Sequence, residues 1–199
     1  NVLAPCFADV STRYLHVPAA AMEWETRADL VVQELSEACP DIIALQEVMH
    51  ELFEADLQPR LASLGYAGIM QQRTRKDDDH PTGNATFFRE DRFELGWEAH
   101  RSRILLLGLR DKQSNGMEIC VANAHLEGNP RQPMARARSA LQDARKRGGP
   151  QQHGLILCGD FNAPLSSIKR PCYILGDPVH GFRVSDGLQK LDEAFENWV

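Results

Sequence analysis

Apolar residues show two different patterns along this chain: helical spacing and short continuous runs. Between residues 25 and 39 they recur at helical spacing with charged side chains on the other side, and Pro40 then ends the predicted helix. Further helices are predicted over 51–64, on either side of Pro59, and over 134–147. Short apolar runs predict strands over residues 42–45, 67–72, 84–89, 103–109, 118–126 and 154–161.

The order of these elements indicates the fold class. Helices separate some of the strands, whereas others follow one another closely, as in hairpins. This mixture favours an α/β protein with mixed sheets over a purely parallel one. From residue 163 onward prolines and glycines predict a loop-rich segment, with one last helix over 186–198. We therefore expect residues 1–199 to form one domain, or one domain with a piece missing.

Composition narrows the class of protein. Apolar residues make up 43% and charged residues 25% of the chain, which is typical of a globular protein with a sizeable core. No apolar run approaches the roughly 18 residues of a membrane-spanning helix, so we expect no membrane partner. The net charge of −6 excludes a uniformly basic nucleic-acid-binding chain. It leaves open a nucleic-acid substrate, because metal ions can supply positive charge at a cleft.

The five cysteines show no CxxC pair. Cys120 and Cys158 lie inside apolar strand-like runs, where a free thiol packs as a small hydrophobic group. The pattern favours a reducing compartment, cytoplasmic or nuclear, without a zinc site or a disulfide framework.

Polar residues lie at the ends of four apolar runs. If these runs are strands, the polar residues lie at the edge of a sheet, where ligand sites are often found. A carboxylate beside amide oxygens suits a hard cation such as Mg²⁺, which keeps waters and binds phosphate. The residues are Asn1 in NVL, Glu47 in ALQEV, Asn123 and His125 in VANAHLEGNP, and Asp160 and Asn162 in LILCGDFNAP.

Each of these residues, taken alone, also has a structural interpretation. Glu47 would be a solvated strand end, and His125 a hydrogen-bonded structural histidine. Asp160 and Asn162 would form a turn in which their side chains bond nearby backbone groups. The occurrence of all four clusters in order favours the functional interpretation.

Two further polar segments have competing interpretations. The run Asp77–Asp79 with His80 resembles a metal cluster, but three consecutive carboxylates cannot all face one ion, so a solvated loop is favoured. The basic stretch Arg131–Arg147 could follow a phosphate backbone. The exposed face of a helix is the favoured alternative there.

The segments DIIALQEV, GNATFFRE, VANAHLEGNP and LILCGDFNAP resemble, in order, the motifs of the endonuclease/exonuclease/phosphatase superfamily. The opening NVLAPCF and the helix before QEV are similar to the carbon-catabolite-repression-type deadenylase branch, which includes nocturnin and the angel proteins. The resemblance covers nearly the whole chain. It implies a DNase I-like four-layer α/β sandwich, in which two packed mixed sheets lie between outer helices.

The resemblance also implies an activity and a role for each matched residue. The activity is Mg²⁺-dependent phosphodiester hydrolysis, with Mn²⁺ able to substitute, most similar to 3′-exonucleolytic cleavage of RNA that releases nucleoside monophosphates. Glu47 would bind the metal with help from Asn1. His125 and Asn162 would contact the scissile phosphate, and Asp160 would orient the attacking water or stabilise the transition state.

Two more residues take roles from the resemblance on the substrate side. Asn123 would brace His125, and Pro130 would touch the substrate. Hydrolysis of a small phosphorylated metabolite or dinucleotide is the alternative activity, and an inactive binding module is the alternative from another class.

The chain departs from the superfamily pattern near its end. The closing Asp-x-Ile-Phe-like strand and Ser-Asp-His segment are not found. Ser185-Asp186 carries only the first two letters of the Ser-Asp-His segment. His180 is a candidate stand-in for the missing histidine, but this interpretation is not favoured. We therefore expect that the C-terminal end of the domain is missing, or that the protein is inactive.

Overall fold

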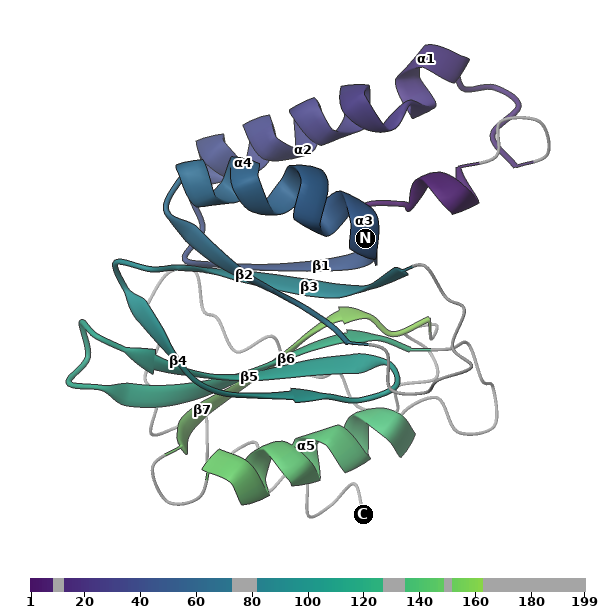
Figure 1. Ribbon diagram of the computed structural model, residues 1–199. Helices are drawn as coiled ribbons and strands as arrows, with labels where there is room; N and C mark the ends of the chain where they lie inside the picture. The colour runs from purple at the N-terminus through teal and green to yellow at the C-terminus, as the bar shows by residue number, and fades with distance from the viewer. Residues whose placement is uncertain (9–12, 73–81, 127–134, 149–151, 163–199) are drawn as a thin grey trace, which may run out of the picture.

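The computed structural model describes residues 1–8, 13–72, 82–126, 135–148 and 152–162. These residues form four layers (Figure 1): a helical layer, two β-sheets and a further helix. The first sheet has the order β1-β3-β2 and the second the order β4-β5-β6-β7. The strands are β1 (Ile42–Met49), β2 (Tyr66–Met70), β3 (Thr82–Arg89), β4 (Phe93–His100), β5 (Ile104–Asp111), β6 (Met117–His125) and β7 (Gln152–Asp160).

Helices cover the outer face of each sheet (Figure 1). The fourth layer, below the second sheet, is α5 (Ala135–Gly148). The first layer and the N-terminal segment contain the 3₁₀ turn η1 (Pro5–Phe7), α1 (Ala19–Met22), α2 (Trp24–Ala38), α3 (His50–Leu52), the π-helical turn η2 (Phe53–Leu57) and α4 (Gln58–Ser63).

The predicted four-layer sandwich is confirmed, with one refinement in strand direction. Strand β3 pairs antiparallel with both β1 and β2, so the first sheet is purely antiparallel. The second sheet is mixed, because β4, β5 and β6 pair antiparallel whereas β7 pairs parallel with β6. A parallel neighbour requires a crossover connection, and α5 lies in that connection.

Strand β4 is not among the strands predicted from the sequence, and Asn1 was placed at the end of an apolar run. In β4, apolar Phe93, Leu95, Trp97 and Ala99 alternate with polar or small residues, which is the period of a half-buried strand. A register shift between Leu95 and Trp97 moves the inward positions from one face of the sheet to the other. The segment around Asn1 is not assigned to a strand and joins β1 through the bond from Val2 N–H to Gln46 O, 3.0 Å.

The predicted helices are present with shifted ends. Helix α2 ends where Cys39 adopts a left-handed φ of 44° and donates its N–H to Leu35 O, and Pro40 prevents continuation. The second predicted helix is three successive segments, and Pro59 lies in the first turn of α4, where proline is tolerated. The predicted helix over 186–198 lies outside the described residues.

Apolar side chains fill the three spaces between the layers. Phe53, Leu57 and Phe87 lie between the helices and the first sheet. Phe88, Leu105, Leu107 and Val121 lie between the sheets, and Leu106, Cys120, Ala122 and Ala144 lie between the second sheet and α5. The two faces of β5 thus supply different cores, which is why its apolar run is continuous rather than alternating.

Cys120 is fully buried in this core, as its apolar surroundings predict. The described cysteines are all free thiols: Cys6 and Cys39 are exposed, and Cys158 is partly buried. In the parts of the chain that the structure describes, no helix is long and apolar enough to span a bilayer.

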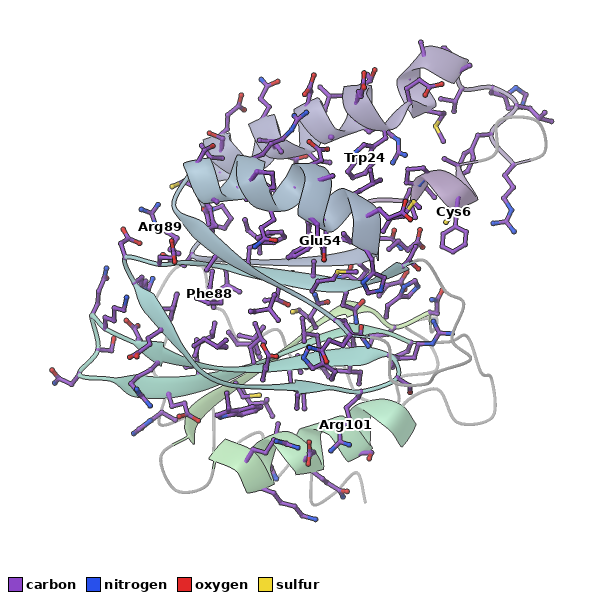
Figure 2. The ribbon with its side chains drawn as sticks, viewed as in Figure 1. Cys6, Trp24, Glu54, Phe88, Arg89 and Arg101 are labelled. Atoms are coloured by element: carbon purple, nitrogen blue, oxygen red, sulfur yellow. The ribbon has the colours of Figure 1, made fainter. Side chains whose placement is uncertain are left out.

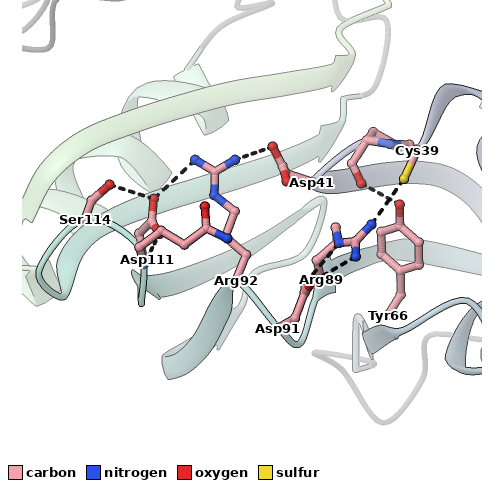
Figure 3. Close-up of polar contacts among 10 residues, drawn as sticks. Cys39, Asp41, Tyr66, Arg89, Asp91, Arg92, Asp111 and Ser114 are labelled. Atoms are coloured by element: carbon pink, nitrogen blue, oxygen red, sulfur yellow. Dashed lines mark hydrogen bonds and ion pairs between the residues drawn. The ribbon is translucent and has the colours of Figure 1, made fainter.

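An ion-pair cluster joins the two sheets at the end where β1 begins and β5 finishes (Figure 3). Arg92 contacts Asp41 through one terminal nitrogen and Asp111 through the other, the latter at 3.2 Å. Burial disfavours ionised Asp111, but the N–H of Gln113, Arg92 and the hydroxyl of Ser114 donate to it and lower its pKa. This cluster fixes the spacing of the sheets at the end opposite to the site described next.

Candidate functional site

The candidate site lies where the ends of β1, β6 and β7 meet the N-terminal segment. His125 and Asp160 are register partners in the parallel pair β6–β7. The Nε2 atom of His125 lies 3.9 Å from Asp160 Oδ2 and 4.0 Å from Glu47 Oε1. Asn1 contacts both carboxylates, so the four polar residues that sequence analysis took from separate segments form one group.

Glu47 reaches this group because β1 contains a β-bulge. Leu45 pairs with Ala85 and Val48 with Gly83, so two residues of β1 stand opposite one residue of β3. Glu47 has a φ of 58°, which is uncommon for a residue other than glycine. Bulges re-aim side chains and are frequent beside active sites. Here the bulge turns the Glu47 carboxylate away from the pleated surface and toward the strand ends.

Asn1 connects the two carboxylates directly. Its Nδ2 donates to Glu47 Oε1 at 2.8 Å and to Asp160 Oδ2 at 3.3 Å. The other oxygen of Glu47 accepts the N–H of Ala4 at 3.3 Å. Both oxygens of Glu47 are therefore bonded to the N-terminal segment, and that segment forms one wall of the site.

Asp160 is fixed by a tight turn at the end of β7. Its Oδ1 accepts the N–H of Asn162 at 2.9 Å, and the Nδ2 of Asn162 donates to Leu126 O at 2.8 Å. Asp160 and Asn162 therefore form a turn and also belong to the candidate site, so the two interpretations are compatible. One oxygen of Asp160 is used by the turn, and the other faces His125 and Asn1.

Gly159 makes this approach of β7 to β6 possible. Its φ is 129°, and a Cβ atom at this position would lie 1.9 Å from Ala124 O. No other residue fits without displacing the backbone of β6. The Gly-Asp pair in CGDF therefore brings Asp160 close to His125 for steric reasons.

The site is partly shielded from solvent. The side chains of Glu47, His125 and Asp160 are 14%, 24% and 33% exposed, so all three remain partly accessible to solvent. Asn162 is exposed beside them. Glu47, Leu3 and Asn162 all have positive φ, at 58°, 52° and 44°. Such conformations are costly and cluster at functional sites.

The donor atoms suit a small divalent cation. Two carboxylate oxygens converge on the positive end of the Asn1 amide dipole, and the same convergence favours a cation. Among the described residues no group of three or more His, Cys, Asp or Glu has metal-binding geometry. Mg²⁺ is usually held by one or two carboxylates together with waters and substrate phosphate. Glu47, Asn1 and Asp160 supply oxygens of that kind.

Asn123 was expected on the substrate side of the site as a brace for His125, and the structure corrects this expectation. Its side chain is fully buried, so it cannot touch a ligand. Its Nδ2 donates to Leu45 O and Ala85 O at 3.0 Å and to Thr86 Oγ1 at 3.2 Å, which links β6 to the first sheet. None of the described hydrogen bonds of Asn123 goes to His125.

Gln46 and Arg27 are two residues near the site that sequence reasoning missed. Gln46 Nε2 donates to Asn123 Oδ1 at 2.8 Å, and its Oε1 accepts the backbone nitrogen of Asn1 at 3.0 Å. Arg27 donates to the carbonyls of Val2 and Leu3. The position of Gln46 inside the apolar run IIALQEV was a signal that its side chain is buried and hydrogen-bonded. The helical pattern around Arg27 offered none.

Three predicted features lie outside the described residues. They are Pro130, His180 and the Asp77–Asp79 loop.

Comparison with known proteins gives one consistent family. The profile of the Endonuclease/Exonuclease/phosphatase family matches residues 1–171. Nocturnin of Drosophila melanogaster is 31% identical over 181 residues, which cover 82% of this chain and 28% of that protein.

Similar solved structures include two of related proteins. The crystal structure of ANGEL2, a 2′,3′-cyclic phosphatase, gives a TM-score of 0.69 at 25% identity and covers 82% of this chain and 51% of that one. The human Nocturnin catalytic domain with bound sulfate gives 0.64 at 28% identity, with 82% and 62% covered. The chain spans less than half the length of the nocturnins that it matches.

Proposed function

The chain belongs to the endonuclease/exonuclease/phosphatase family, and from that premise we propose that it contains the main part of a divalent-metal-dependent phosphodiesterase site acting on the 3′ end of RNA. The observation that carries this proposal is that the Nε2 atom of His125 lies within 4.0 Å of a carboxylate oxygen of Glu47 and of Asp160. The ends of three strands and the N-terminal segment bring these side chains together.

Each residue of the group has a chemical role in this proposal. Glu47, with the amide oxygen of Asn1, would hold the cation. His125 would donate its Nε2–H to a non-bridging oxygen of the scissile phosphate. Asp160 would accept a hydrogen bond from the attacking water, because its Oδ2 faces the group while Oδ1 is held by the Asn162 N–H.

A bound Mg²⁺ would offset negative charge that develops on the phosphoryl oxygens and leaving group. The protein groups act beside it by being fixed before the substrate arrives. The bulge at Glu47, the turn at Asp160 and the β6–β7 register at His125 all fix side chains through backbone geometry. Such preorganised groups need no rearrangement during the reaction.

The similarity to the nocturnins and to ANGEL2 supports a nucleotide or RNA substrate. A second candidate follows from one observation, the likeness to a structure titled as that of a 2′,3′-cyclic phosphatase, at a TM-score of 0.69. Both substrates place a phosphodiester at or next to a ribose 3′ position. The same protein groups could therefore serve either reaction.

The test compares the full-length protein with Glu47→Gln and with the matched control Glu51→Gln, an exposed glutamate on α3. Mn²⁺ binding is measured by electron paramagnetic resonance. Hydrolysis is measured with Mg²⁺ on oligo(A) ending in a 3′-hydroxyl and on oligo(A) ending in a 2′,3′-cyclic phosphate. We expect Glu47→Gln to weaken Mn²⁺ binding at least 10-fold and to lower kcat/KM by about 10²- to 10⁴-fold.

The outcomes separate the candidates. Shortening of the 3′-hydroxyl substrate supports the exonuclease, and opening of only the cyclic phosphate supports the second candidate. Unchanged Mn²⁺ affinity in Glu47→Gln would refute the metal assignment. Metal binding without turnover of either substrate, or of small phosphorylated metabolites, would favour an inactive binding module.

A further inference from the structure

We propose that Arg27 is a positioning residue: from helix α2 it holds the N-terminal segment so that Asn1 reaches Glu47 and Asp160. This inference rests on the proposed function of that site. Arg27 itself touches neither the carboxylates nor a reacting atom, so its effect passes through the backbone of the segment.

The guanidinium of Arg27 donates hydrogen bonds to two consecutive peptide carbonyls. Its Nη1 donates to Val2 O at 2.7 Å and to Leu3 O at 2.6 Å. Its Nε donates to Met22 O at 3.0 Å, just before the start of α2. Hydrogen bonds from a charged donor are shorter and stronger than neutral ones. One side chain therefore ties the segment next to Asn1 to the helical layer.

Arg27 is the side chain outside the site that holds the backbone carbonyls of this segment, whereas the other bonds of the segment go to Gln46, Glu47 and Asp160 within the site. One backbone–backbone hydrogen bond, from Val2 N–H to Gln46 O, joins it to β1 within the described residues. Leu3 has a φ of 52°, which costs free energy for a residue with a Cβ atom and persists only where surroundings impose it. The two carbonyls held by Arg27 flank this strained residue on both sides of its φ and ψ bonds.

Arg27 is itself fixed by a neighbouring tryptophan. Its Cζ lies 5.4 Å from the ring centroid of Trp24, within cation–π range. Trp24 Nε1 in turn donates to Asp56 Oδ2 at 2.7 Å. Figure 2 shows Trp24 and Cys6 at the same end of the helical layer, beside the N-terminal segment. The chain of contacts thus runs from η2 through Trp24 and Arg27 to the segment.

The burial of Arg27 shows that its charge is retained at a cost. Burial lowers the pKa of the guanidinium, and its Nη2 atom is buried without a hydrogen-bond partner in the described structure. A residue needed only to fill space would be apolar here. The planar guanidinium is the group that reaches two adjacent carbonyls and a third one at once, which a lysine ammonium cannot do.

The experiment uses the full-length protein with Arg27→Met, which keeps the aliphatic stem and removes the donors, and Arg27→Lys, which keeps the charge. Arg147→Met is the control, since Arg147 is an exposed arginine on α5 that pairs with Asp143 and, among the described residues, has no hydrogen bond or ion pair with the N-terminal segment or with the Trp24–Asp56 pair. The first readout is amide hydrogen exchange by nuclear magnetic resonance. It does not depend on activity.

In Arg27→Met we expect the amides of Leu3 and Ala4 to exchange at least 10 times faster, since their acceptors are Asn1 Oδ1 and Glu47 Oε2. Amides of β5 should keep their rates. The second readout is the Mg²⁺ concentration for half-maximal rate, which should rise at least 10-fold. With subsaturating Mg²⁺, kcat/KM should fall about 100-fold, the usual effect of a misplacement of about 1 Å. Arg27→Lys should lie between Arg27→Met and the wild type.

Unchanged exchange at Leu3 and Ala4 in Arg27→Met would overturn the proposal, as would faster exchange with an unchanged Mg²⁺ requirement. Loss of protection throughout β5 in both Arg27 variants, but not in Arg147→Met, would also overturn it, because Arg27 would then support the whole fold. If no form of the protein hydrolyses either substrate, the proposed function fails, whereas the exchange result still decides whether Arg27 holds the segment.

Discussion

Replacing Asn123 with alanine should destabilise the protein more than any surface amide change, although Asn123 does not contact the ligand side of the site. The amide is fully buried between the sheets. Its two N–H donors are shared among Leu45 O, Ala85 O and Thr86 Oγ1, and its Oδ1 accepts from Gln46. At about 1 kcal/mol for each of these two donors and one acceptor, the loss amounts to about 3 kcal/mol.

That loss is large beside the stability of a typical domain, about 5–15 kcal/mol. For a chain of this size it corresponds to a fall in Tm of about 6–12 °C. Asn123→Asp, which keeps the shape but places a carboxylate against Leu45 O, Ala85 O and Thr86 Oγ1, should cost still more.

The assay is urea unfolding followed by circular dichroism, with Gln33→Ala as control. Gln33 is exposed on α2 and donates only to Glu37 among the described side chains, so its loss should change stability by no more than about 0.5 kcal/mol. A loss below about 1 kcal/mol for Asn123→Ala would refute the reasoning. It would mean that water or a small sheet movement satisfies the freed groups.

Two further predictions concern titratable groups. Burial raises the pKa of Cys120 to about 12 and of Cys158 to about 11, so at pH 8 iodoacetamide should modify exposed Cys6 and Cys39 first, as read by mass spectrometry of intact folded protein. Equal labelling of all four would contradict the burial. Since the pKa of Asp111 is lowered from 3.8 on folding, its ionised form stabilises the protein above pH 3.8, and that contribution is lost as pH falls through the lower folded-state value. Asp111→Asn should therefore be less stable at pH 7 and lose less stability on acidification, measured by Tm at successive pH values.

Strands that form buried cores were the most predictable part of the fold. Both faces of β5 pack in a core, so its residues are apolar whichever face they lie on, and the strand is recognised from its continuous apolar run. In β4 the alternation of Phe93, Leu95, Trp97 and Ala99 indicates a strand, but this pattern is weaker than the continuous apolar runs of β3 and β5, and the prediction omitted it. The direction of β7 followed from pairing with β6, which no local pattern encodes.

The site was predictable as a set of residues but not as a geometry. Glu47, His125 and Asp160 each end an apolar run, and strand ends meet at sheet edges, so their meeting followed from the topology of the resembled family. The bulge at Glu47 is a two-against-one pairing with β3, and it depends on a partner strand far along the chain. The error at Asn123 arose because position on a strand does not reveal whether a side chain faces solvent or a second sheet.

The contact between Asn1 and Asp160 spans 159 residues of sequence, and this has a consequence for biosynthesis. Ribosomes add about 5–20 residues each second, so Asp160 is synthesised about 8–32 s after Asn1. During that interval the first sheet can form, because β1, β2 and β3 follow one another in the chain and, among the described strands, pair with one another. The emerging protein thus carries Asn1 and Glu47 without His125 or Asp160, and the complete group of side chains forms only when β7 joins β6.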